Sequence, residues 1–432
     1  MTTRIALAAL ATIAPLAAVL IAARPVLVSA QREAARPVTA LLTLPTQPTP
    51  PTPLTFDAAL DLATSRNLGL VAARHQRAIR EAAVRAAGQR PNPDFTFDAT
   101  RDAPHYAATF GLPIELGGRR QRRIDLAKEE LTLADVDVRV ELRLMRKELR
   151  QAFYSLVAAD ERVRLDESVL EIARRVHGAA QARFETGAAP RLEVLQADLG
   201  VTRADTDLDV ARSIRAAAQA SLNAVLNLPP QQAVAVSGTL GDRATAPAYD
   251  GALALAIASN VDLVRLDRAI AIEQRRADLL RADRVPAPIF SVGGVFSNPN
   301  EFNAGLSAGV SIGLPIFSRN QGEIAQSVAA TAQLRAVRDD TRRDVENSVF
   351  GTVAKIAAQR RQADAFQQRL VPTATDLESL AEESYRAGGT SILAVLDAQR
   401  SLRDLRREAL QAMLDLQFSL ADLEEILGAA LP

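Results

Sequence analysis

Apolar residues recur at every second position in two separate stretches of the chain, and this alternation predicts two β-hairpins. In the first stretch, the alternation runs from Phe95 to Ala99 and returns from Tyr106 to Ile114. In the second, it runs from Phe290 to Phe296 and, after a turn over Ser297–Asn300, from Phe302 to Leu314. Strands of about a dozen residues with one apolar and one small, polar face fit a transmembrane barrel. They fit equally a soluble sheet that packs on a helix.

Long helices are predicted between and around these hairpins. The first begins near Phe56 and ends at about Gly88, just before Pro91 and Pro93. Stretches from Gly118 to Gly187 and from Gln321 to Val371 contain no proline, and the first could reach on the order of 100 Å at 1.5 Å per residue. Small residues on several faces suit helices that pack on both sides in a closed ring, and a long two-stranded coiled coil is the alternative.

The second half of the chain repeats the order of parts of the first half. The segment Gly111–Ile114 at the end of the first hairpin returns as Gly313–Ile316 after the second. The segment Phe184–Gly187, where a glycine interrupts the helical pattern, returns as Tyr385–Gly388. Matches in the same order at nearly constant spacing indicate a duplication of one structural unit.

The N-terminus has the pattern of a secretory signal peptide. Arg4 precedes an apolar run from Ile5 to Ala23, and small residues at Val28–Ala30 predict cleavage after Ala30. The run is long, so an uncleaved membrane anchor is the alternative. No later segment is apolar and long enough to cross a bilayer as a helix, so strands must do so if the mature chain enters a membrane. The predicted organisation is a signal peptide at residues 1–30, a Pro-rich tether at 31–54, and structural repeats at 55–240 and 241–432.

Composition narrows the function classes. The formal net charge of zero lacks the basic footprint of a nucleic-acid-binding protein. The absence of cysteine excludes disulfides, thiolate chemistry and a lipid anchor on a mature N-terminal cysteine. His75, His105 and His177 lie far apart and show no ligand spacing. We therefore expect no metal site. The sequence also shows no nucleophile paired with a general base and no phosphate-binding loop, so we expect no cofactor and no enzyme activity.

Three stretches of the chain resemble the outer membrane factor (TolC-like) family of efflux ducts, and within it the cation-efflux, CzcC-like branch. They are the strand-to-helix junction Gly111–Arg120, the turn region Phe184–Ala197, and its counterpart Tyr385–Gln399. The resemblance covers essentially everything after the tether, and the junction carries most of the branch assignment.

The resemblance implies a mainly α fold with a small β part. Duplicated long antiparallel helices would form a trimeric α-barrel, and four strands per chain would contribute to a 12-stranded transmembrane β-barrel. Geometry agrees, because four strands cannot close a barrel and three copies leave room for a passage. The implied location is the outer membrane of a Gram-negative cell, with the helical part in the periplasm.

The implied partners are two further copies of the chain, outer membrane lipid, a periplasmic adaptor and an inner membrane RND pump. The duct would passively export heavy-metal cations, with drugs and other organic solutes as the alternative within the family. A periplasmic coiled-coil adaptor or structural protein held by an uncleaved anchor is the alternative from another class.

Three sets of residues are candidate sites. The predicted adaptor-docking tip comprises Gly187, Pro190, Leu192, Gly388, Thr390 and Ser391. We expect Pro190 to occupy the first helical position after its turn, and plain turn chemistry is the alternative for this set. Glu193 and Asp397 are candidate acids at the tunnel entrance, where threefold symmetry would form cation-favouring rings, or simply solvated surface. The family often has a further acid one turn before Asp397, but this chain has Ala394.

The third set follows the first hairpin directly and comprises Arg119, Arg120, Arg122 and Arg123. Cations at a helix start oppose the helix dipole, so local helix energetics do not explain the cluster. We expect contact with anionic lipid groups, and a solvated charge run is the alternative.

Overall fold

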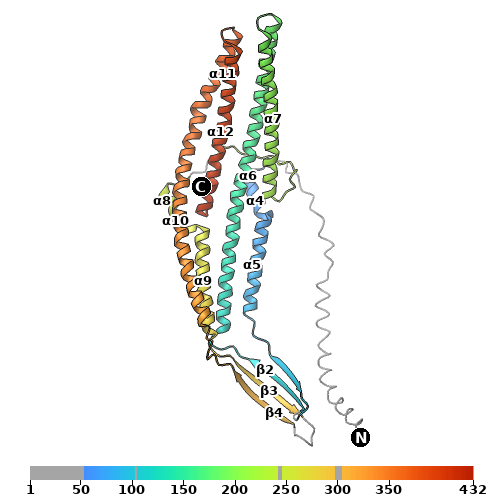
Figure 1. Ribbon diagram of the computed structural model, residues 1–432, viewed down its shortest axis with the longest axis vertical. Helices are drawn as coiled ribbons and strands as arrows, with labels where there is room; N and C mark the ends of the chain where they lie inside the picture. Colours follow the sequence, from blue (N-terminus) through green and yellow to red (C-terminus); the bar gives the residue numbers. More distant parts are fainter. Residues whose placement is uncertain (1–52, 103–104, 242–245, 297–303, 432) are drawn as a thin grey trace, which may run out of the picture. The chain divides into compact units, whose positions relative to one another are not determined.

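The computed structural model describes residues 53–102, 105–241, 246–296 and 304–431 (Figure 1). The predicted signal peptide at residues 1–30 lies outside the described residues. So do residues 31–52 of the predicted tether and the predicted turn over Ser297–Asn300.

Each half of the described chain contributes helices on both sides of a hairpin, as the duplication predicts. The helices of the first half are α4 (Phe56–Arg66), α5 (Leu68–Ala87), α6 (Arg119–Glu185) and α7 (Arg191–Val225). Those of the second half are α8 (Tyr249–Ser259), α9 (Val261–Ala282), α10 (Gln321–Ala365), the π-helical turn η2 (Phe366–Leu370), α11 (Val371–Arg386) and α12 (Ile392–Leu427).

The two predicted hairpins are confirmed, and they join into a single sheet. Its strands are β1 (Asp94–Ala99), β2 (Tyr106–Pro113), β3 (Pro288–Phe296) and β4 (Gly305–Ile312). All neighbours are antiparallel and the order is β1-β2-β3-β4, so β2 and β3 join the two halves of the chain.

The register of the sheet places apolar residues of all four strands on one face. Directly paired residues share a face, and successive residues alternate between faces. One row across the sheet consists of Phe95, Phe110, Val292 and Ala308, and the next consists of Phe97, Ala108, Gly294 and Leu306. On the opposite face, the row between them consists of Thr96, Thr109, Gly293 and Ser307. The apolar face is uncovered in the single chain, where Leu306 is 95% exposed.

The predicted first helix is two helices, because Asn67 leaves the helical conformation between α4 and α5. Its side-chain oxygen accepts a hydrogen bond from the backbone N–H of Leu70 at 3.1 Å, which caps α5. Its amide nitrogen donates to the carbonyl of Val225 at the end of α7 at 3.3 Å. The same side chain therefore starts one helix and joins it to the end of another.

Asn260 repeats this arrangement in the second half. Its side-chain oxygen accepts from Leu263 N at 3.1 Å at the start of α9, and its amide donates to the carbonyl of Ile426 in α12 at 2.9 Å. Asn260 is buried, so both its acceptor and its donor need partners. In the first half, the apolar periodicity that predicted one helix from Phe56 to Gly88 could not reveal the break at Asn67, since a capping side chain interrupts the pattern at one position only.

The long helices form the framework on which the shorter ones pack. Helix α6 is unbroken over 67 residues, and α5 and α7 both pack along it (Figure 1). In the second half, α9 and α12 pack in the same way along the run from α10 to α11. That run continues through Pro372 by way of the π-helical turn η2. The wider turn of η2 accommodates Pro372, because proline lacks a backbone N–H and its ring crowds the preceding turn.

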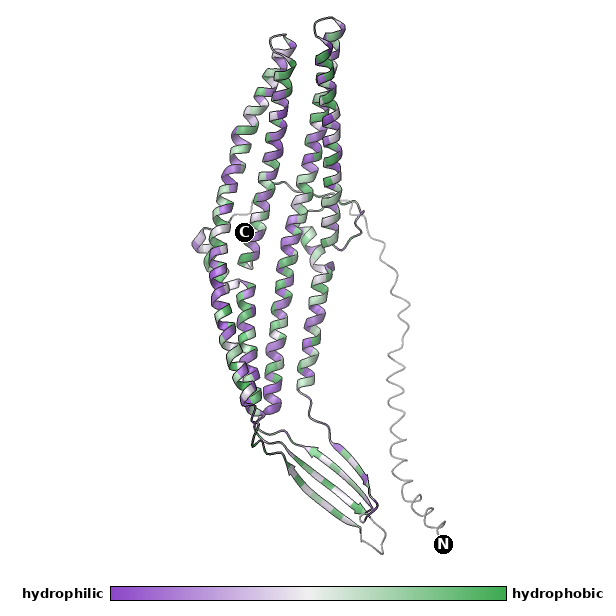
Figure 2. Ribbon diagram, in the orientation of Figure 1, coloured by the Kyte–Doolittle hydropathy of each residue, from purple (hydrophilic) through white to green (hydrophobic). Residues whose placement is uncertain are grey.

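The core is divided along the helices into several clusters. The largest surrounds Leu149, Phe153 and Leu156 of α6, while another joins α8, α10 and α12 around Val349 and Leu420. Figure 2 shows hydrophilic and hydrophobic residues mixed along every long helix. No helix in the described part of the chain combines the length and apolar character needed to cross a membrane.

The two halves are also joined by buried ions. Arg150 of α6 is buried and binds Glu424 of α12 at 2.8 Å, with Gln417 as a second acceptor at 3.2 Å. Farther along the same helices, Arg407 of α12 lies 2.7 Å from the buried Asp166 of α6. These pairs fix the register between α6 and α12, because a slide of either helix would leave a buried charge unpaired.

Candidate functional site at the helical turns

Two equivalent turns join α6 to α7 and α11 to α12. They lie at the end of the helical part that is opposite the sheet (Figure 1). Gly187 and Gly388 adopt left-handed backbone conformations, with φ of 73° and 78°. In each turn a backbone N–H bonds to the carbonyl five residues earlier, from Ala188 to Arg183 and from Gly389 to Ser384. This pattern is the Schellman motif, and it accounts for a glycine at each position.

The predicted docking residues surround these two turns. Leu192 is 62% exposed at the start of α7, and Gly388, Thr390 and Ser391 are all exposed. Pro190 is the N-cap of α7 and not its first helical residue, because its ψ of 154° is extended. Ser391 occupies the equivalent N-cap of α12, and its side chain forms no capping hydrogen bond. The turns therefore present small and apolar groups, together with a hydroxyl that the helix start does not use.

A buried tyrosine links the two helical hairpins behind the turns. The Tyr385 hydroxyl of α11 donates a hydrogen bond to Glu193 Oε2 of α7 at 2.9 Å. The Arg183 guanidinium of α6 lies over the Tyr385 ring, 4.6 Å from its centroid, and donates to the Tyr385 carbonyl at 2.9 Å. Three helices thus meet at one side chain, and an aromatic ring beneath a guanidinium adds a cation–π attraction.

The environment of Tyr385 keeps its hydroxyl protonated. Burial, which disfavours the phenolate, and the hydrogen bond to the Glu193 carboxylate raise the pKa of Tyr385 to about 12. The nearby Arg183 acts in the opposite direction but is outweighed. Tyr385 therefore remains a hydrogen-bond donor throughout the physiological pH range.

Sequence reasoning selected Glu193 but missed Tyr385 and Arg183. Tyr385 occupies the repeat position of Phe184, and the added hydroxyl at an otherwise aromatic position was the available signal. A pairing across 192 residues gives no local pattern, so the partnership itself was not visible.

The structure gives the two candidate entrance acids different surroundings. Glu193 is half-buried and accepts the Tyr385 hydrogen bond. The Asp397 side chain is 74% exposed, and its nearest cation is Arg400 at 3.8 Å. Their arrangement in rings stays a prediction. Within the ranges that the structure describes, no group of three or more His, Asp or Glu side chains could hold a metal ion.

Three of the four clustered arginines bind the protein itself. Arg119 lies 2.6 Å from Asp283 just after α9, and Arg120 donates to the Gly88 carbonyl at the end of α5 at 2.7 Å. Arg123 lies 2.6 Å from Glu115 and also donates to the Ala87 carbonyl. These contacts give the cluster a local function that the sequence did not reveal, namely to tie the start of α6 to the ends of α5 and α9. Arg122 is exposed and makes none of these contacts, and lipid contact by the cluster stays a prediction.

Two long helical hairpins carried on an antiparallel sheet with one uncovered apolar face define the class of outer membrane channel subunits. A sequence model described as outer membrane efflux protein matches residues 59–228 and 252–429, in two stretches that follow the duplication. The chain belongs to this family, whose members are channel proteins. It is therefore an efflux channel protein of the outer membrane, with its helices on the periplasmic side.

Individual relatives agree with the family. The chain is 28% identical over 381 residues to the cobalt-zinc-cadmium resistance protein CzcC of Cupriavidus metallidurans, covering 87% of this chain and 90% of that protein. It is 24% identical to the pyoverdine export outer membrane protein OpmQ of Pseudomonas putida, over 80% of each.

Solved structures show the same fold. CusC, a protein that forms a transmembrane channel, matches with a TM-score of 0.72 at 17% identity, over 87% of this chain and 92% of that chain. The open state of the MtrE outer membrane channel of Neisseria gonorrhoeae matches with a TM-score of 0.71 at 17% identity, over 87% and 89%.

Proposed function

We propose that three copies of this chain form one continuous duct across the outer membrane. The single observation that carries this proposal is the register of the sheet, which gathers the apolar residues of four strands on one face. β1 and β4 are the outer strands of the sheet, and each has an edge that no described strand pairs. An unpaired edge in lipid leaves backbone groups unsatisfied, so the sheet must be continued by other copies.

Three copies supply twelve strands, which close a barrel wide enough for a passage. The apolar face would then contact lipid, and the small, polar face would line the lumen. The helices would continue this wall as a hollow tube in the periplasm. Such a duct conducts passively, and the proposal requires no catalytic residue, cofactor or resident metal.

The two turns are the proposed contact with the rest of an export system. They form the end of the helical part opposite the sheet (Figure 1). Exported substrate would enter a duct of the outer membrane at this periplasmic end. We assign Gly187, Pro190 and Leu192, with Gly388, Thr390 and Ser391, to docking with a periplasmic adaptor, which would connect the duct to an inner membrane RND pump. Glu193 and Asp397 lie just past these turns and are the proposed acids of the entrance. Their triplication would favour cations, although the engagement of Glu193 by Tyr385 leaves Asp397 as the freer contributor.

Heavy-metal cations are the proposed cargo, because CzcC is a cobalt-zinc-cadmium resistance protein. CzcC has a higher identity to this chain than OpmQ does, and it matches a larger share of the chain. Organic solutes are the second candidate, since another relative exports pyoverdine. A duct offers no dedicated substrate pocket, so the choice rests on the pump that feeds it.

An export assay separates these cargoes. The chain would be expressed in a Gram-negative host strain from which the host's metal-efflux channel has been removed. The adaptor and pump genes would come from the genome that encodes this chain. We expect lower cellular cobalt, zinc and cadmium than in cells that express the adaptor and pump alone. Unchanged metal content combined with increased release of an organic solute would favour the second candidate. No effect on either class would contradict the proposed function.

A further inference from the structure

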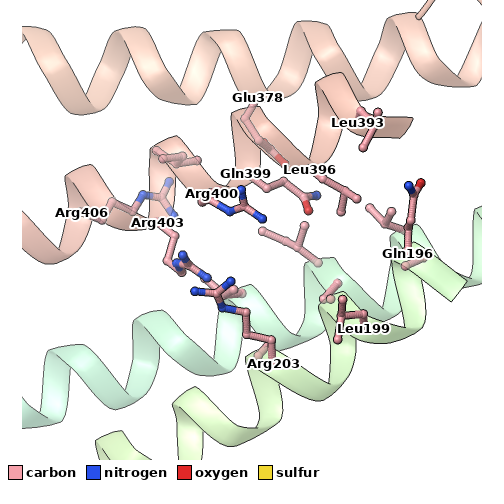
Figure 3. A pocket seen from close by; sticks show the side chains of 18 of the residues that line it. Gln196, Leu199, Arg203, Glu378, Leu393, Leu396, Gln399, Arg400, Arg403 and Arg406 are labelled. Carbon is pink, nitrogen blue, oxygen red and sulfur yellow. The ribbon is translucent and has the colours of Figure 1, made fainter. Parts of the chain in front are cut away.

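A groove near the turns separates the two helical hairpins of the chain. It has a volume of about 250 Å³ and lies between α6 and α7 on one side and α11 and α12 on the other (Figure 3). Its apolar lining includes Leu165 and Val169 of α6 and Leu396 and Leu402 of α12. An apolar floor of this kind excludes water from whatever charge enters the groove.

The charged lining of the groove is almost entirely basic. Arg203 extends from α7, while Arg400, Arg403 and Arg406 extend from α12 into the same space (Figure 3). The only acid in the lining is Glu378 of α11. Four guanidinium groups thus share the groove with one carboxylate, and carboxylates outside the lining pair with two of the four.

Two of these arginines have no anionic partner in the described part of the chain. Arg403 pairs with Asp404 at 2.9 Å and with Asp207 at 3.6 Å, and Arg400 lies 3.8 Å from Asp397. Arg203 and Arg406 form no ion pair within the described ranges; Arg203 is exposed, whereas Arg406 is half-buried. Two guanidinium groups at one groove without counter-charges leave a place for an anion.

A buried amide adds a second, independent sign of a missing partner. Gln399 Nε2 is buried and has no hydrogen-bond acceptor among the described residues, and Gln399 lies in the groove between the arginines and Gln196 (Figure 3). Buried polar groups are nearly always satisfied, so this donor can bind an acceptor that enters the groove, whether water or a partner group. Glu378 Oε1, on the facing helix α11, is likewise buried without a donor among the described residues.

The size and position of the groove identify the source of the anion. Its volume lies below the roughly 300–1,000 Å³ typical of sites for drug-sized ligands, so it accepts one or two side chains. Gln196 and Leu393 line its end nearest the turns, a few residues beyond Pro190 and Ser391. The groove is therefore continuous with the proposed docking surface.

We infer that this groove receives an aspartate or glutamate side chain from a helical hairpin of the periplasmic adaptor, with Arg203 and Arg406 as its ligands. The inference rests on the proposed docking at the turns and adds the chemistry of the partner to it. A guanidinium binds a carboxylate through paired, charge-assisted hydrogen bonds, and the carboxylate would also accept from Gln399. Charge complementarity at a partly desolvated groove would select acidic partner residues over basic ones.

The test uses the full-length oligomer in detergent and the purified adaptor that supports export in the assay above. The groove variant is Arg203→Glu/Arg406→Glu, the tip variant is Gly388→Ala/Ser391→Ala, and the matched control is Arg361→Glu, an exposed α10 arginine outside the groove lining. We expect roughly 10- to 100-fold weaker adaptor binding by the groove variant and little change for the control. Each Asp or Glu of the adaptor hairpin is then changed to Lys in turn. One of these changes should weaken binding to the unaltered channel and restore binding to the groove variant.

Three outcomes would overturn the inference. If the tip variant loses binding and the groove variant does not, docking at the turns stands and the groove has another role. If the groove variant dissociates the channel oligomer itself while Arg361→Glu does not, the groove is occupied by a neighbouring copy of this chain. If millimolar sulfate binds the unaltered channel but not the groove variant, and no Asp or Glu to Lys change in the adaptor restores binding to the groove variant, the occupant is a free anion. If the groove variant and the tip variant both form intact oligomers and both bind the adaptor normally, the proposed docking itself is contradicted.

Discussion

The Tyr385 hydroxyl donates a hydrogen bond to the Glu193 carboxylate at 2.9 Å, and this bond joins the two helical hairpins of one chain close to their turns. Tyr385 itself is buried in a cluster with Val176 and Ala180 of α6 and Ile392 and Val395 of α12. The two hairpins are therefore held together at this end of the chain by the Tyr385–Glu193 bond and the Arg183–Tyr385 carbonyl bond, both set in an apolar contact surface.

Removal of the hydroxyl should loosen the hairpins without unfolding them. In Tyr385→Phe the ring can still pack beneath Arg183, but Glu193 loses its donor. A hydrogen bond to a charged group contributes about 1.5–3 kcal/mol, so we expect faster backbone hydrogen exchange at residues 183–195 and 383–395. Tyr249→Phe is the control, because Tyr249 packs against Phe350 through its ring. Equal exchange in Tyr385→Phe and the unaltered protein would show that the bond does not hold the hairpins together.

The same contact predicts a pH dependence. Tyrosine ionises at about pH 10 in unfolded chains, whereas the pKa of Tyr385 is raised to about 12. The folded arrangement thus favours the neutral hydroxyl, and its contribution is fully present below about pH 10 and is lost as the pH rises towards 12. The Tyr385 hydroxyl should therefore titrate well above pH 10.

Tyrosinate absorbance of the folded oligomer measures this directly. The difference between the titration curves of the unaltered protein and Tyr385→Phe should have its midpoint near pH 12, with circular dichroism recorded at each pH to verify the fold. A difference curve centred near pH 10 would contradict the buried, hydrogen-bonded environment of Tyr385.

Two left-handed glycines should respond very differently to alanine. Gly187 has a φ of 73°, and a Cβ there would have no heavy atom within 4 Å, so Gly187→Ala should cost only about 1–2 kcal/mol of backbone strain. Gly428 has a φ of 69°, and its Cβ would lie 2.4 Å from the Ser259 carbonyl oxygen. Since backbone cannot yield as a flexible side chain does, Gly428→Ala should lower the unfolding temperature several times more than Gly187→Ala. Similar decreases would contradict the close approach of α12 to the end of α8.

The arginine cluster offers a comparison of two neighbours. Arg123→Ala removes the 2.6 Å contact to Glu115 and the bond to the Ala87 carbonyl, so it should destabilise the junction between helices and sheet. Arg122→Ala removes neither contact and should leave the unfolding temperature unchanged. If lipid contact is the main role of the cluster, Arg122→Ala should instead reduce insertion into anionic vesicles. Loss of insertion in the variant with all four arginines changed to alanine, but not in Arg123→Ala, would support the lipid role, and unchanged insertion in that fourfold variant would exclude it.

The sequence predicted those features of the fold that depend on local periodicity. Alternation from Phe290 to Phe296 predicted β3, and the glycines at 187 and 388 predicted the two turns, because both signals lie within a few residues of the structure they specify. It could not predict that Asn67 both breaks a helix and binds the end of α7, since the partner carbonyl of Val225 is 158 residues away. For the same reason Arg119 looked like a free cation until the fold brought Asp283 to it.

The candidate site was predictable to the same extent. The turns and Glu193 were found from the repeat and the family resemblance, whereas the role of Tyr385 depends on burial that only the packing of four helices creates. The basic groove between the hairpins combines residues of α7 and α12 that are about 200 positions apart, and no local charge pattern joins them.

The mass of the mature protein extracted from outer membranes tests the central claim most directly. Light scattering in detergent, with the detergent contribution subtracted, should give three times the mass of one mature chain, and the oligomer should precipitate when detergent is removed. A water-soluble monomer or dimer would contradict both the duct and the closure of three sheets into one barrel.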